Sequence, residues 1–210
     1  MYGGLTTVTE GRTRLAVLVS GTGSNLQALL DASHDGSLPA DVVLVVSDRH
    51  EAAALDRARD AGISAVAIPP GPGEERSRYD STIAAIVAEH EPDLVVLAGW
   101  MRILTMSFLR HFPGQVVNLH PALPGDLAGT NAIERAFDEA RAGTRTATGV
   151  MVHHVPDEGV DDGPVLASVE VPIHADDTLD TLAARVHAAE HELLVHTIAD
   201  LCSPTPSAKG

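Results

Sequence analysis

The strongest constraint on this fold is a repeated alternation of short, continuous apolar runs with helical patterns. Five runs are expected to form buried strands, at residues 15–19, 42–46, 65–68, 94–97 and 115–119. Helical patterns lie between them, at residues 26–32, 51–61 and 76–91. Strands that are apolar on both faces and joined through helices are typical of parallel sheets covered on both sides. The alternation predicts an α/β fold with a doubly wound, mostly parallel sheet.

The pattern changes in the last third of the chain. Residues 131–142 and 179–201 have helical spacing, and the second of these helices is long and amphipathic. Residues 149–155 and 165–171 are β-branched runs with only a loop between them. Because no helix separates these two strands, we expect them to pair antiparallel at the edge of the sheet.

The chain is expected to form a single domain. No repeat or linker divides residues 14–202, and 44% apolar residues in a chain of 210 can build a sizeable core. Residues 1–13 and 203–210 lack such patterning, so a flexible arm and a flexible tail are expected there. The sequence leaves a monomer and a homodimer equally open.

The charge and the cysteine content of the chain limit its possible binding partners and its possible cellular compartment. The formal net charge of −15 argues against nucleic acid or an acidic membrane surface as the main partner. A small anionic ligand stays possible, because it needs only a local positive field. The single cysteine, Cys202, excludes a disulfide framework and favours a reducing, cytoplasmic location. No apolar run approaches 18 residues, so no membrane span is expected.

A glycine-rich loop, Ser20-Gly21-Thr22-Gly23-Ser24-Asn25, follows the first predicted strand and precedes a helix. The glycines permit close approach of a ligand, and the free N–H groups of a helix N-terminus attract a phosphate. The third glycine of a dinucleotide fingerprint and the lysine of a P-loop are missing, which favours a monophosphate. The alternative is an ordinary turn in which Ser24 or Asn25 caps the helix.

The tetrapeptide Asn118-Leu119-His120-Pro121 comes at the end of a predicted buried strand. Asn118 and His120 lie two residues apart and so share one face of that strand. An amide donor beside a group that titrates near neutral pH suits acyl-type chemistry, and open α/β sheets bind ligands at this edge. A histidine that bonds only to backbone is the alternative.

Two acidic features accompany these motifs. The loop from Asp157 to Asp162 could be a surface turn, a cation site without the spacing of a calcium loop, or the source of a carboxylate that orients His120. Glu190 falls within the apolar stripe of the last helix and needs a partner there. His187 and His191 have a zinc-compatible spacing, but no third ligand is in register, so no metal is expected.

Taken together, the motifs resemble the folate-dependent phosphoribosylglycinamide formyltransferase family. Four segments occur in the order and at the spacing of that family, namely 19–27, 97–104, 118–123 and 160–165. The resemblance covers residues 14–201 and implies a Rossmann-like formyltransferase fold. It further implies transfer of a formyl group from 10-formyltetrahydrofolate to the amine of glycinamide ribonucleotide, in purine biosynthesis and without a metal.

The resemblance also assigns expected roles to residues of this chain. The catalytic group would be Asn118, His120 and Asp161. Phosphate binding falls to Gly23, Ser24 and Asn25, and ribonucleotide binding to His187 and Glu190. Folate binding falls to Arg76, Met101, Arg102, Ile103, Leu104 and Asp157. Asn118 would donate to the oxyanion, His120 would protonate the departing folate nitrogen, and Asp161 would pair with His120.

Two departures from the family pattern and several rival functions remain. Asn131 stands where the family often has a histidine, and the acid loop is one residue longer than in some members, so Asp162 is an alternative partner for His120. A formyltetrahydrofolate hydrolase would use the same three catalytic residues with water. A nucleotide- or folate-binding protein without catalysis would need none of them. A methionyl-tRNA formyltransferase would need an RNA-binding domain for which this acidic chain has no room.

Overall fold

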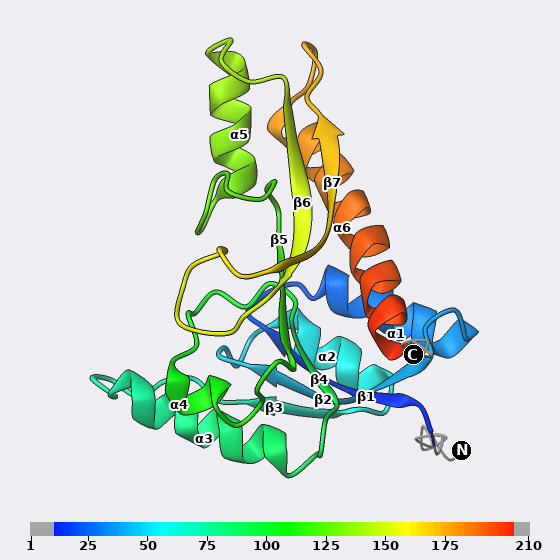
Figure 1. Cartoon of the computed structure of the whole chain (residues 1–210), viewed down its shortest axis with the longest axis vertical. Helices are drawn as coiled ribbons and strands as arrows, with labels where there is room; N and C mark the ends of the chain where they lie inside the picture. The colour runs from blue at the N-terminus through cyan, green and yellow to red at the C-terminus, as the bar shows by residue number, and fades with distance from the viewer. Residues whose placement is uncertain (1–10, 204–210) are drawn as a thin grey trace, which may run out of the picture.

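The computed structural model describes residues 11–203, which form one mixed sheet with helices on both faces (Figure 1). The strands are β1 (Thr13–Val19), β2 (Ala40–Ser47), β3 (Ser64–Ala67), β4 (Leu94–Leu97), β5 (Val116–His120), β6 (Ala147–His154) and β7 (Val165–Pro172). The helices are α1 (Ser24–Asp35), α2 (Ala53–Asp60), α3 (Arg76–Ala88), α4 (Met106–Leu109), α5 (Ala132–Arg141) and α6 (Leu179–Cys202).

The sheet order is β3-β2-β1-β4-β5-β6-β7. Strands β1 to β5 pair in parallel, whereas β6 runs antiparallel to both β5 and β7. The chain moves outward from β1 to β3 and then returns to place β4 on the other side of β1. The order therefore reverses between β1 and β4, and a crevice forms at such a switch point in open α/β sheets.

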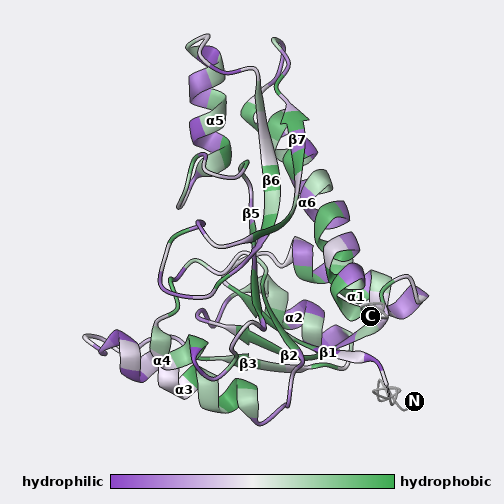
Figure 2. Ribbon diagram, in the orientation of Figure 1, coloured by the Kyte–Doolittle hydropathy of each residue, from purple (hydrophilic) through white to green (hydrophobic). Residues whose placement is uncertain are grey.

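Each face of the parallel half has its own apolar layer, which is why its strands are apolar throughout. Leu15, Val17 and Val19 of β1 pack with α1, α2 and α6, while Ala16 and Leu18 of the same strand pack with α3 and α4. All five of these side chains are fully buried. Figure 2 shows the contrast between the apolar central strands and the helices, which alternate apolar and polar residues. Adjacent residues of a strand point to opposite faces, so a two-sided core needs this continuous apolar pattern.

The predicted architecture is confirmed, including the mostly parallel sheet and the antiparallel edge. Every predicted strand and helix is present, with ends that differ by a few residues. Helix α4 was not predicted, because it has only four residues and is defined by a local cap, in which the Thr105 side chain accepts from the Ser107 N–H.

The chain ends extend the predicted domain slightly. Strand β1 begins at Thr13, and the Arg12 side chain donates to the carbonyl oxygens of Leu38 and Ala40. Both residues belong to the segment in which an arm was expected. Residues 1–10 of that arm and 204–210 of the expected tail lie outside the described residues. Within residues 11–203, none of the helices combines the length and apolarity that a membrane crossing requires.

Candidate active site

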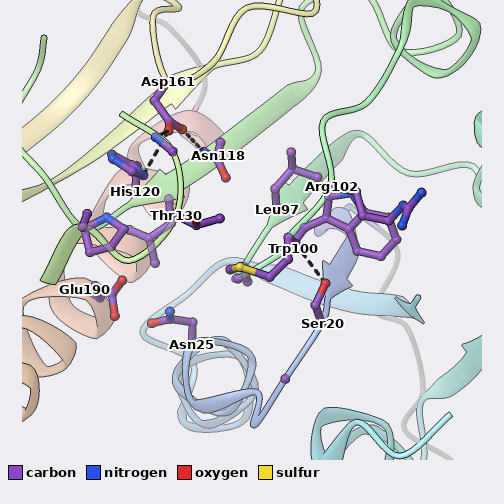
Figure 3. Close-up of a pocket in the computed structure, with 18 of the residues that line it drawn as sticks. Ser20, Asn25, Leu97, Trp100, Arg102, Asn118, His120, Thr130, Asp161 and Glu190 are labelled. Carbon is purple, nitrogen blue, oxygen red and sulfur yellow. Dashed lines mark hydrogen bonds and ion pairs between the residues drawn. The ribbon is translucent and has the colours of Figure 1, made fainter. Parts of the chain in front are cut away.

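A pocket of about 430 Å³ opens at the carboxyl ends of β1, β4 and β5, at the switch point of the sheet. Its wall is contributed by the loop after β1, the loop after β4, the end of β5, the loop around Asp161 and one face of α6. This volume lies within the usual range for small-molecule sites. Figure 3 shows the polar side chains converging on the cavity from these separate segments.

The glycine-rich loop forms one wall of the pocket. Gly23 precedes α1 with φ 74°, and no side chain caps this helix. A Cβ on Gly23 would lie 2.5 Å from the Cβ of Ala54, so only glycine fits here. The alternative prediction, a turn capped by Ser24 or Asn25, is therefore wrong. No side-chain oxygen therefore competes for the first N–H groups of α1, as an anion site requires.

The reaction centre predicted at the end of β5 is a cluster of four side chains. Asn118 and His120 share a face of β5, and His153 stands directly opposite Asn118 on the antiparallel neighbour β6. Asp161 reaches the cluster from the loop after β6, where it adopts φ 54°. Its carboxylate lies 3.0 Å from Asn118 Nδ2 and 3.3 Å from His120 Nδ1 (Figure 3).

The Asp161 carboxylate is ionised by its surroundings. Burial by itself raises the pKa of this carboxyl group and is the largest single influence, but hydrogen bonds from protonated His153 and from the Gly129 N–H, together with the charges of His120 and His153, outweigh it. The net effect is that the pKa of Asp161 lies below its ordinary value. A buried carboxylate that stays charged in this way can hold a neighbouring imidazole in one orientation or accept a proton.

His120 meets an oxygen at each of its ring nitrogens. Nδ1 faces Asp161, and Nε2 lies 3.1 Å from the carbonyl oxygen of Leu127. A carbonyl and a carboxylate can only accept, so the Leu127 hydrogen bond and the Asp161 ion pair are both satisfied only when both ring nitrogens carry a proton. The ring is 5% exposed, so these two oxygens fix its plane. This geometry suits a histidine that carries a proton to deliver.

Both hydrogens of the Asn118 amide nitrogen are already used. Nδ2 lies 3.0 Å from Asp161 and 3.1 Å from His153 Nε2, and Figure 3 shows the amide oxygen turned away from Asp161. In the neutral form of His153, Nδ1 donates to the carbonyl oxygen of His154 at 2.9 Å, which leaves Nε2 to accept from Asn118. The predicted oxyanion donor is therefore engaged in this structure.

His153 is the site residue that the sequence did not reveal. The predicted strand at 149–155 contained it, but only the register of β5 against β6 places it opposite Asn118. The family resemblance favoured Asp161 as the partner of His120 and kept Asp162 as the alternative. The structure brings Asp161 to His120, whereas the Asp162 side chain is exposed and packs beside Gly159.

Glu190 and His187 form the opposite wall on α6. Glu190 is 5% exposed, and its Oε2 lies 2.6 Å from Nδ1 of the half-buried His187. Hydrogen bonding to Glu190 raises the pKa of His187, although burial opposes this shift. The carboxylate that the helical stripe singled out therefore has a histidine partner and still lines the cavity.

The remaining wall is an apolar lip after β4. Met101 and Ile103 are exposed large apolar side chains, whereas Leu104 is buried. The Arg102 guanidinium lies 5.0 Å from the centre of the Tyr79 ring. The Met101 N–H donates to the Ser20 hydroxyl, which ties this lip to the glycine-rich loop (Figure 3).

Two of the predicted folate residues lie away from the cavity wall. Arg76 donates to the carbonyl oxygen of Ile103 and so supports the lip from behind. The Asp157 carboxylate accepts from the Gly159 N–H within its own loop. Neither side chain is among those that line the pocket. Among residues 11–203, no group of three or more His, Cys, Asp or Glu side chains could hold a metal ion.

Known proteins of similar sequence align with most of this chain. It is 43% identical over 196 residues to the phosphoribosylglycinamide formyltransferase of Schizosaccharomyces pombe, covering 88% of this chain and 94% of that protein. It is 42% identical over 182 residues to the trifunctional purine biosynthetic protein adenosine-3 of Bos taurus. That alignment covers 87% of this chain but only 18% of the longer bovine protein.

Solved structures match the fold equally well. The glycinamide ribonucleotide transformylase 1 of Symbiobacterium toebii superposes with a TM-score of 0.86 at 34% identity, over 95% of this chain and 93% of that one. The enzyme of the same name from Geobacillus kaustophilus gives 0.85 at 38% identity, over 91% and 100% of the two chains. The formyl transferase family model matches residues 13–198. This chain belongs to the formyl transferase family.

Proposed function

We propose that this protein transfers a formyl group from 10-formyltetrahydrofolate to the amine of glycinamide ribonucleotide. One observation carries the proposal: ionised Asp161, with Asn118 and His120, shares a single pocket with an uncapped glycine-rich loop. An acid–base centre and an anion site are what joining a phosphorylated amine to an acyl donor requires. Family membership and the printed activities of the relatives support the same reaction.

The two ligands are assigned to opposite parts of the pocket. The phosphate would lie at Gly23, Ser24 and Asn25, where α1 offers free N–H groups. The ribonucleotide would extend along α6 toward the His187–Glu190 pair, whose carboxylate can accept from an amine or a hydroxyl. This arrangement brings the amine of the ribonucleotide toward Asp161.

The folate would lie along the apolar lip of Met101, Ile103 and Leu104. Exposed apolar side chains at a cavity mark a place where the face of a flat heteroaromatic ring can pack. Arg102 is assigned to the carboxylates of the folate. Arg76 and Asp157 lie outside the pocket wall. We assign Arg76 the role of supporting the backbone of the lip, and Asp157 the role of shaping the acid loop.

The chemistry follows from the cluster. The amine nitrogen attacks the formyl carbon, and the carbonyl electron pair moves to oxygen. Asp161 accepts the proton that the amine loses, His120 gives a proton to the folate nitrogen, and the bond from carbon to that nitrogen breaks. Asn118 can stabilise the oxyanion once one of its amide hydrogens breaks its hydrogen bond to Asp161 or His153 and donates to the oxyanion instead. When Asp161 accepts the proton of the amine it becomes neutral, and its hydrogen bond to the Asn118 amide weakens. The amide is therefore released at the stage at which the oxyanion needs a donor.

A formyl-transfer assay with and without ribonucleotide tests the proposal. We expect formylated ribonucleotide and tetrahydrofolate in equal amounts, and little tetrahydrofolate when the ribonucleotide is omitted. Equal release of tetrahydrofolate in water alone would identify a hydrolase. Binding of both ligands without turnover would identify a non-catalytic binding protein.

A further inference from the structure

Residues 126–129, which we call the cradle loop, support the reaction centre, and Gly129 at the end of this loop also lines the pocket. Two main-chain groups of the cradle loop point inward: the Leu127 carbonyl accepts from His120 Nε2 at 3.1 Å, and the Gly129 N–H donates to Asp161 at 2.8 Å. The loop thus holds His120 and Asp161 at once. Any movement of its backbone moves the acceptor that fixes the plane of the His120 ring.

The cradle loop needs outside support because its backbone is strained. Leu127 has φ 41°, a conformation that branched, non-glycine residues avoid. Such a conformation persists only when its surroundings over-determine it. The Leu127 side chain is buried in a small cluster of alanines, which is little packing to hold a strained carbonyl in place.

Two arginines hold the cradle loop from outside. Arg145 binds the Asp126 carboxylate through two hydrogen bonds, of 2.6 and 3.0 Å, and binds Glu139 with its Nε. Arg135 donates to the Ala128 carbonyl at 2.8 Å. The tied residues directly flank Leu127. The Arg145 side chain is only 16% exposed, so its bidentate pair is the firmer of the two ties.

We propose that Arg145 and Asp126 are positioning residues for His120, which they orient through the Leu127 carbonyl. Neither side chain lines the pocket, so neither is expected to touch a substrate. Breaking the pair frees the cradle loop and lets the His120 ring turn away from its productive plane. Only the kinetic test of this proposal rests on the proposed function. The orientation of the His120 ring can be measured directly, whatever reaction the protein catalyses.

Arg145→Gln and Asp126→Asn test the pair in the full-length protein. We expect kcat to fall about tenfold in each variant while both KM values stay within about twofold, because misplacing a catalytic group costs rate more than binding. The double variant should be no slower than the slower single one, since both remove the same interaction. Arg145→Lys, which keeps the charge but loses the fork, should restore part of kcat.

Arg185→Gln is the matched control. It breaks another bidentate pair, in which Arg185 binds Asp177 at 2.7 and 2.8 Å, without touching the cradle loop. We expect it to lower stability without changing kcat of the folded enzyme. A similar loss of kcat in this control would overturn the proposal, because any lost ion pair would then have the same effect.

The ¹⁵N signals of the His120 ring provide the second readout. They should shift in Arg145→Gln and Asp126→Asn and stay unchanged in Arg185→Gln. Unchanged signals together with wild-type kcat would overturn the positioning role while the proposed function stands. A shifted ring in a protein that shows no formyl transfer would leave the positioning role intact and reject the proposed function. If Arg145→Gln does not fold, the nearly isosteric Asp126→Asn decides.

Discussion

The two sides of the pocket are built in different ways. The proposed phosphate side is one loop of six consecutive residues at the start of α1, which packs against Ala54 and is held by hydrogen bonds to Ala54, Gly99 and Met101. The reaction centre combines groups from β5, the cradle loop, β6 and the loop around Asp161. One side therefore depends on local backbone conformation, and the other on distant segments meeting in register.

This difference determines how each side should fail. On the proposed phosphate side, a change of backbone conformation at one residue should be enough to weaken ligand binding. In the reaction centre, each side chain has two or more partners, so removing one releases the others as well. Substitutions on the two sides should consequently separate turnover from binding.

The largest expected effect is on turnover. His120→Ala or Asn118→Ala should lower kcat by about 10²–10³, because each removes a group that stabilises developing charge. Ribonucleotide affinity, measured by calorimetry, should change little, since the phosphate loop is untouched. Near-normal kcat in either variant would show that the cluster is structural.

Asp161→Asn should lower kcat by about 10²-fold, because a neutral amide cannot accept the amine proton and holds His120 more weakly. Asp162→Asn is the matched control, one residue away but exposed. Steady-state kinetics should show little change in this control. The opposite ranking would mean that the loop adopts another register when ligands bind.

Gly23→Ala should weaken ribonucleotide binding about tenfold and cost roughly 1–3 kcal/mol of stability, because it combines a positive φ with a clash. The clash is with Ala54, at 2.5 Å. Gly21→Ala is the control in the same loop, since no atom lies within 4 Å of its added Cβ. Calorimetry and urea unfolding measure the two effects. Equal losses in both variants would contradict the structural role of Gly23.

The smallest effect concerns pH and the His187–Glu190 pair. Hydrogen bonding to Glu190 raises the pKa of His187 in the folded protein. The pair therefore stabilises the fold fully below the pKa that His187 has in the unfolded chain. This stabilisation is lost as pH rises through the pKa of His187 in the folded protein. His187 is half-exposed, so we expect a loss of only about 0.5 kcal/mol between slightly acidic and alkaline pH.

Urea unfolding at several pH values measures this loss. It should disappear in His187→Gln, and His196→Gln controls for the loss of an exposed ring from the same helix. A wild-type curve that parallels His187→Gln at every pH would show that the pair does not stabilise the fold.

Much of the fold was predictable because its signals are local. The continuous apolar runs of β1, β2 and β4 identify strands with cores on both faces, and the segment between β6 and β7 carries no helical pattern. Helix α4 escaped prediction because four residues carry no periodicity. The ring partner Leu127 and the strand neighbour His153 escaped it because their contacts depend on register and on a strained loop.

By itself, the sequence determined the α/β architecture, the glycine-rich loop and the placement of Asn118 and His120 on one face of the same strand. These follow from periodicity and from chemistry within a few residues. Only the tertiary structure decided that Asp161 rather than Asp162 meets His120, that His153 holds Asn118, and that Arg145 lies behind the site. Such choices depend on how segments far apart in the chain align, and alignment is set by packing of the whole domain.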